Sequence, residues 1–77
     1  MHAQAIKQLL ATHFPDAHIT VEGEDGRHFT ATIIAPAFRG KSRVEQQQMV
    51  YAIVGPHITS GNIHALSLKT STPEEHQ

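Results

Sequence analysis

A long helical connection between two strands constrains this 77-residue chain most. Apolar and polar residues alternate over 27–34, which predicts a strand, and a further strand is predicted over Asn62–Thr70. Between them, Ser42 and Glu45 have the spacing of a helical capping box. A parallel pair of strands needs a crossover of this length. If these two strands are neighbours, their first residues therefore lie at the same end of one sheet.

Two amphipathic helices are predicted. The first covers residues 3–14, and the second opens at Ser42 and is expected to end or kink at Gly55-Pro56, because proline lacks an amide hydrogen and disfavours helix in the residue before it. Their apolar stripes consist of Ala3, Ile6, Leu9, Leu10 and Phe14 in the first helix and Met49, Val50, Ile53 and Val54 in the second. The run Gln46–Gln48 and Tyr51 mostly lie off the second stripe, so we expect a polar helix face, with a partner surface as the alternative.

The remaining elements form a hairpin. A strand over His18–Glu22 is joined to the strand over 27–34 by the turn Gly23–Gly26, in which Asp-Gly is a strong hairpin signal. The order helix, strand, strand, helix, strand predicts the α+β class, with one two-layer domain over 1–77. Both helices are expected to cover one face of a three-stranded sheet. We expect residues 71–77 to form a flexible tail.

Composition limits the function classes. The formal net charge is −1, whereas chains built to grip phosphate backbones are usually much more basic. No apolar run approaches the roughly 20 residues that span a bilayer, and no signal peptide is indicated, so we expect a soluble cytoplasmic protein. No catalytic motif is found, so we do not expect an enzyme. The chain contains seven histidines and no cysteine, which leaves metal binding to imidazoles and excludes thiolates of its own.

Two histidines stand at the starts of the strands that the crossover joins. His28 opens one strand and His64 the other, and adjacent strands lie only about 4.7–4.9 Å apart. The two side chains could therefore share one metal ion. Side-chain alternation opposes this, since His28 points off the core face while His64 has the same parity as the apolar residues of its strand. An irregular strand start or a bulge would reconcile them. The other histidines show no convergent spacing: His2, His13, His18, His57 and His76.

A basic turn precedes the second helix. Arg39, Lys41 and Arg43 surround its N-terminus, where backbone amides and the positive end of the helix dipole also favour an anion. These residues are a candidate contact for a nucleic-acid phosphate or a partner's carboxylate. The alternative is a solvated turn that keeps the protein soluble.

A family resemblance emerges from the second half of the chain. The pattern Phe38-x-Gly40-x-Ser42-Arg43-Val44, the run 46–51, the strand 63–70 and the segment 72–75 resemble the BolA family, most closely its short bacterial members of the IbaG (YrbA) type. The resemblance implies a class II KH-like fold. It also implies that His64, with His28, ligates a [2Fe–2S] cluster shared with a monothiol glutaredoxin. In such pairs, the glutaredoxin cysteine and glutathione supply the sulfur ligands. The implied role is cluster assembly, cluster trafficking or iron sensing.

The same family suggests an alternative function. Some BolA-like proteins are described as DNA-binding transcription regulators in stress and morphology responses, which would use Arg39, Lys41 and Arg43 here. The G-x-x-G loop with which KH domains clamp nucleotides is absent, because Gly40-Lys41-Ser42-Arg43 has only the first glycine. The sequence leaves open whether the free chain forms a homodimer.

Overall fold

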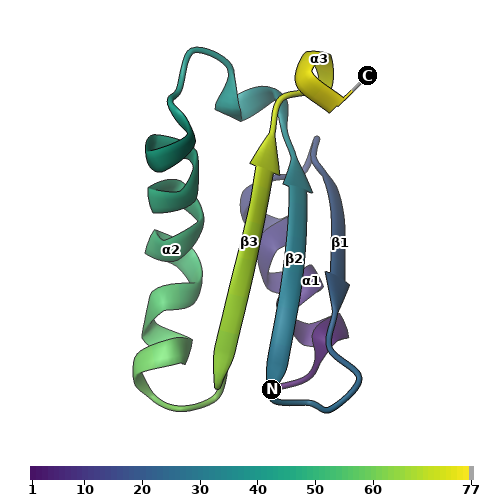
Figure 1. The fold of residues 1–77 in the computed structure, drawn as a ribbon, viewed down its shortest axis with the longest axis vertical. Helices are drawn as coiled ribbons and strands as arrows, with labels where there is room; N and C mark the ends of the chain where they lie inside the picture. Colours follow the sequence, from purple (N-terminus) through teal and green to yellow (C-terminus); the bar gives the residue numbers. More distant parts are fainter. Residues whose placement is uncertain (77) are drawn as a thin grey trace.

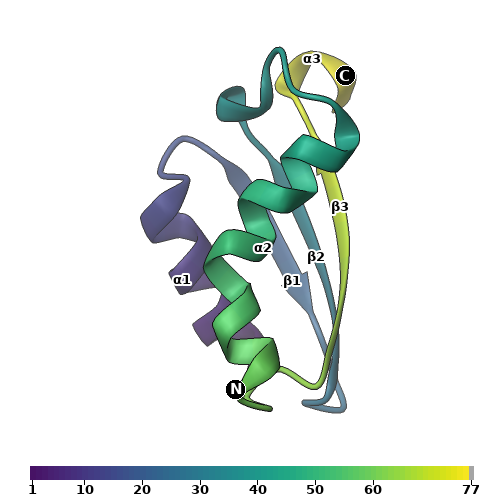
Figure 2. The same ribbon diagram turned by 90° about the vertical axis from the view of Figure 1, so that its left-hand side faces the viewer.

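A three-stranded sheet carries two helices on one face (Figures 1 and 2). This is a computed structural model, and it describes residues 1–76. Its elements are α1 (Ala3–His13), β1 (His18–Glu22), β2 (His28–Ile34), the 3-10 turn η1 (Pro36–Phe38), α2 (Arg43–Thr59), β3 (Ala65–Ser71) and α3 (Pro73–His76). The predicted α+β class and α-β-β-α-β order are confirmed, with α3 added at the end. No helix among the described residues is long and apolar enough to cross a membrane.

The sheet has the order β1-β2-β3, with β2 in the centre. β1 and β2 form an antiparallel hairpin, whose turn includes Gly26 in the left-handed region at φ 71°. β2 and β3 are parallel, with His28 in register with Ala65 and Ile34 with Ser71. The crossover through α2 therefore joins neighbouring parallel strands, and both strands begin at the same end of the sheet.

The helices and the sheet form two facing layers (Figure 2), and the hydrophobic core is formed by side chains from both layers. Its most deeply buried large side chains come from every layer: Ile6, Leu10, Ile33, Phe38, Val50, Val54 and Ile63. Fully burying a side chain of this size contributes about 1.5–3 kcal/mol. Both predicted apolar stripes face this core, with Met49 and Ile53 partly buried at its edge.

Of the predicted end or kink of α2 at Gly55-Pro56, the end is wrong, because the helix continues through Pro56 to Thr59. Proline removes one intrahelical hydrogen bond. Burial of apolar side chains offsets this loss, because Val54 is fully buried and Ile58 packs against the core. The last helical turn therefore stays packed on the protein. The chain turns away at Gly61, which has a left-handed φ of 86°.

Gln46 corrects the expected polar face of α2. Its side chain is only 2% exposed, because Gln46 lies one helical turn before the buried Val50. Its Nε2 donates a hydrogen bond to the carbonyl oxygen of Lys41 at 3.1 Å. Gln46 stands four residues before Val50, a spacing that places both on the same helix face. Because glutamine is polar, the sequence pattern did not assign Gln46 to that buried face.

Two boundaries near the C-terminus also differ from the prediction. β3 begins at Ala65 rather than Asn62 and extends to Ser71. Within the segment expected as a flexible tail, Ser71 ends that strand and Pro73–His76 form α3, while Gln77 lies outside the described residues. A second capping box explains the helix: the amide of Glu75 donates to Thr72 Oγ1 at 3.2 Å, and the amide of Thr72 donates to Glu75 Oε1 at 3.0 Å. The sequence Thr72–Glu75 carries this signal, with proline at the first helical position.

Candidate functional site

The two candidate histidines meet at one end of the sheet. The imidazole centroids of His28 and His64 are 5.6 Å apart, and the ring planes are perpendicular. Parallel pairing produces this proximity, because the amide of Ala65 donates to the carbonyl oxygen of Arg27 at 3.0 Å and places the start of β3 beside the start of β2. The convergence that the sequence left open is therefore present.

An irregular strand start resolves the conflict in side-chain parity. His64 lies in the bend before β3, outside the ladder, so the alternation of that strand does not govern its direction. The preceding Ile63 is fully buried, and its amide donates to the carbonyl oxygen of His57 at 3.0 Å. This anchor turns Ile63 into the core and leaves His64 exposed.

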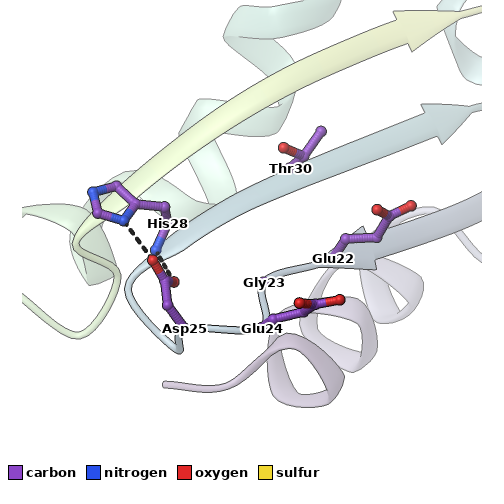
Figure 3. Close-up of a pocket in the computed structure, with 6 residues that line it drawn as sticks. All are labelled: Glu22, Gly23, Glu24, Asp25, His28 and Thr30. Atoms are coloured by element: carbon purple, nitrogen blue, oxygen red, sulfur yellow. Dashed lines mark hydrogen bonds and ion pairs between the residues drawn. The ribbon is translucent and has the colours of Figure 1, made fainter.

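Asp25 in the hairpin turn holds His28 (Figure 3). Its Oδ2 lies 2.8 Å from the Nδ1 atom of His28, and its Oδ1 accepts the backbone amides of Arg27 and His28, both at 2.9 Å. The side-chain hydrogen bond with His28, reinforced by those amides, holds the pKa of the Asp25 carboxyl well below its usual range. Asp25 is therefore an ionised acceptor near neutral pH.

His28 borders an open hollow of about 690 Å³ beside the hairpin turn. Figure 3 shows the residues around it, which are Glu22, Gly23, Glu24, Asp25, His28 and Thr30. Among the side chains that the structure describes, no group of three or more histidine, cysteine or acidic residues is placed to hold a metal ion. The chain therefore offers a pair of imidazoles rather than a complete ligand set.

The geometry of the pair fits a shared metal site. A metal ion lies about 2 Å from each imidazole nitrogen that binds it, so two rings whose centroids are 5.6 Å apart are close enough to bind one ion. A pair of histidines can replace two cysteines on one iron of a [2Fe–2S] cluster. Perpendicular rings at this distance are also an ordinary aromatic contact.

The basic turn is largely neutralised within the chain. Arg39 pairs with Glu74, with Nη2 and Oε1 2.6 Å apart, and Arg43 pairs with Glu75 at 3.2 Å. The carboxylates of Glu74 and Glu75 therefore occupy the positions beside Arg39 and Arg43 at which the sequence predicted an external anion.

The first turn of α2 is also occupied by its own cap. The amide of Glu45 donates to Ser42 Oγ at 3.1 Å, and the amide of Ser42 donates to Glu45 Oε1 at 2.8 Å. A bound phosphate would have to compete with both groups. The structure thus brings His28 and His64 together, and it surrounds the predicted anion site with carboxylates of the chain itself.

Sequence reasoning missed three contributors, which are Asp25, Glu74 and Glu75. Asp25 was assigned only to the hairpin turn, although its three-residue spacing from His28 allows the side chains to meet. Glu74 and Glu75 were placed in a solvated tail, and their distance in sequence from the basic turn gave no signal of the ion pairs.

The two-layer fold, with the order α-β-β-α-β, defines a small α+β domain that matches solved BolA structures. The family described as BolA-like protein matches residues 2–75 of this chain. The chain belongs to this family.

Individual relatives agree with that assignment. The acid stress protein IbaG of Escherichia coli K12 is 36% identical over 75 residues, covering 97% of this chain and 88% of IbaG. A solved BolA homologue from Coxiella burnetii superposes with a TM-score of 0.83 at 39% identity, covering 99% of this chain and 96% of that one. The BolA domain of Arabidopsis thaliana SufE1 superposes with a TM-score of 0.82 at 32% identity, covering 94% and 92% of the two chains.

Proposed function

We propose that this chain is an adaptor that shares a [2Fe–2S] cluster with a monothiol glutaredoxin through His28 and His64. The observation that carries the proposal is the approach of these two imidazoles to 5.6 Å at an exposed end of the sheet. The glutaredoxin cysteine and a glutathione molecule would supply the sulfur ligands. The protein would act in the cytoplasm in cluster assembly, cluster trafficking or iron sensing.

The ligand inventory supports a shared site rather than a self-contained one. Clusters of this type are held by four protein ligands, usually thiolates, and this chain has no cysteine. Both histidines are exposed, so a partner's ligands can reach the same cluster from outside. The BolA fold also occurs as a domain of SufE1, which supports its use as a module attached to other proteins.

The experiment mixes the purified chain with a monothiol glutaredoxin carrying a reconstituted cluster and glutathione, and records visible absorption and circular dichroism. We expect the wild-type chain to change the spectrum, and His64→Ala and His28→Ala each to abolish that change. His18→Ala is the matched control, because His18 is an exposed strand-opening histidine in register with Ile34, at the opposite end of β2 from His28. A spectral change that persists in both site variants would contradict the proposal.

The DNA-binding alternative has less support in the structure. Arg39 and Arg43 pair with carboxylates of α3, and the first turn of α2 is capped. The double variant Lys41→Ala/Arg43→Ala tests this alternative through the salt dependence of binding to duplex DNA. A spectrum unchanged by the wild-type chain, together with salt-sensitive DNA binding that this variant weakens, would favour the regulator.

A further inference from the structure

We propose that Asp25 is a positioning residue that determines which ring nitrogen of His28 is presented to a metal. The inference deepens the proposed function and rests on His28 being a ligand. It concerns the hairpin turn, which contributes no ligand of its own in the proposal above.

The Asp25 carboxylate is itself held in place. Its Oδ1 accepts the amides of Arg27 and His28 at 2.9 Å, and its Oδ2 faces His28 Nδ1 at 2.8 Å. Because one of those amides belongs to His28 itself, the carboxylate grips the backbone and the ring of the same residue. Rotating the Asp25 side chain away would break all three hydrogen bonds.

This contact selects one tautomer of the neutral imidazole. An ionised carboxylate only accepts hydrogen bonds, so the proton must lie on His28 Nδ1, and Nε2 keeps its lone pair. Metal-ligating histidines commonly donate their other ring N–H to a carboxylate, which orients the ring and raises the basicity of the ligand. Asp25 therefore prepares Nε2 of His28 as the metal-binding atom before any partner arrives.

The variant Asp25→Asn isolates this effect. The Asn Oδ1 can still accept both backbone amides, while an NH₂ group replaces Oδ2 and donates to the ring. Nδ1 of His28 must then accept, which moves the ring proton to Nε2 and blocks that atom. Long-range ¹H–¹⁵N NMR of the free chain at about pH 8, above the usual histidine pKa, reads the tautomer directly. We expect the Nδ1–H form in the wild type and the Nε2–H form in the variant.

The second readout is the spectroscopic titration with the glutaredoxin-bound cluster. We expect Asp25→Asn to weaken cluster sharing by about 10- to 100-fold, the usual cost of losing such a supporting contact. Glu24→Gln is the matched control. Glu24 lies in the same turn and borders the same hollow, and this substitution removes the same charge as Asp25→Asn. It should keep both the wild-type tautomer and the wild-type titration.

The outcomes separate this inference from the function on which it rests. A wild-type His28 that carries its proton on Nε2 would overturn the positioning role. If Asp25→Asn gives the same titration as the wild type, the positioning role is overturned as well, while the proposed sharing of the cluster stands. A wild-type chain that produces no spectral change would overturn the proposed function and this inference with it. Amide circular dichroism of each variant verifies that the fold is retained.

Discussion

His28 and His64 meet edge to face at the start of two parallel strands, with their rings at 90° to one another. The contact depends on the register that pairs His28 with Ala65, because a shift by one residue would move the bend that carries His64 along β2. Backbone pairing and the buried Ile63 thus position an exposed pair of side chains. The histidines can change without loss of the core, which makes the site testable by substitution.

The two histidines should act as one unit. If both bind the same cluster, removing either leaves an incomplete ligand set, so the double variant His28→Ala/His64→Ala should lose no more than either single variant. Titration of the visible circular dichroism signal with each variant measures the three losses. Additive losses would indicate two separate contacts with the partner instead of one shared site.

Replacing Gln46 should destabilise the fold. Gln46→Ala removes a buried side chain and leaves the carbonyl oxygen of Lys41 without its donor, so we expect a loss of about 1–3 kcal/mol in the free energy of unfolding. The exposed Gln48→Ala in the same run should change it by less than about 0.5 kcal/mol. Urea unfolding measures both values. Equal losses would show that the side-chain burial of Gln46 contributes nothing.

Gly23 should tolerate no side chain. A Cβ atom there would press against the Phe29 ring, 2.7 Å from Cε1, and would lie 3.1 Å from the carbonyl oxygen of His28. Phe29 is 2% exposed and cannot move freely, so we expect Gly23→Ala to cost about 1–3 kcal/mol through overpacking. Thermal unfolding measures the cost, and the exposed Glu24→Ala serves as the control. A melting temperature unchanged in Gly23→Ala would contradict the close packing of the turn.

Acid should weaken the N-terminal cap of α2. The hydrogen bond from the Ser42 amide, with that from its hydroxyl, lowers the pKa of Glu45 below its ordinary 4.5. A carboxyl whose pKa is lower in the folded state stabilises the protein above its unfolded pKa, and this stabilisation is lost as the pH falls through the folded pKa. We expect wild type to be more stable than Glu45→Gln at pH 7, with the difference shrinking as the pH falls below the ordinary pKa of 4.5. Urea unfolding across this range measures it, and a pH-independent difference would contradict the assigned role of the charge.

Sequence periodicity was sufficient for most of the fold. The stripe of α1, the alternation of β1 and β2, and the Ser42 capping box are local patterns, and each predicts an element that the structure contains. The length of the crossover also indicated the parallel pair, because a short turn cannot join parallel strands. Local rules failed at Pro56 and Gln46, where packing against the core outweighed the propensity of one residue.

The sequence by itself determined which side chains are available: two histidines at strand starts, no cysteine and a basic turn. Only the tertiary structure decided how they meet. The direction of the His64 side chain depends on a backbone bend outside the ladder, anchored by Ile63. The charges of the basic turn are paired with carboxylates from the far end of the chain. Periodicity specifies a face within a regular element, but it carries no information about irregular backbone or about partners distant in sequence. Long-range packing sets both.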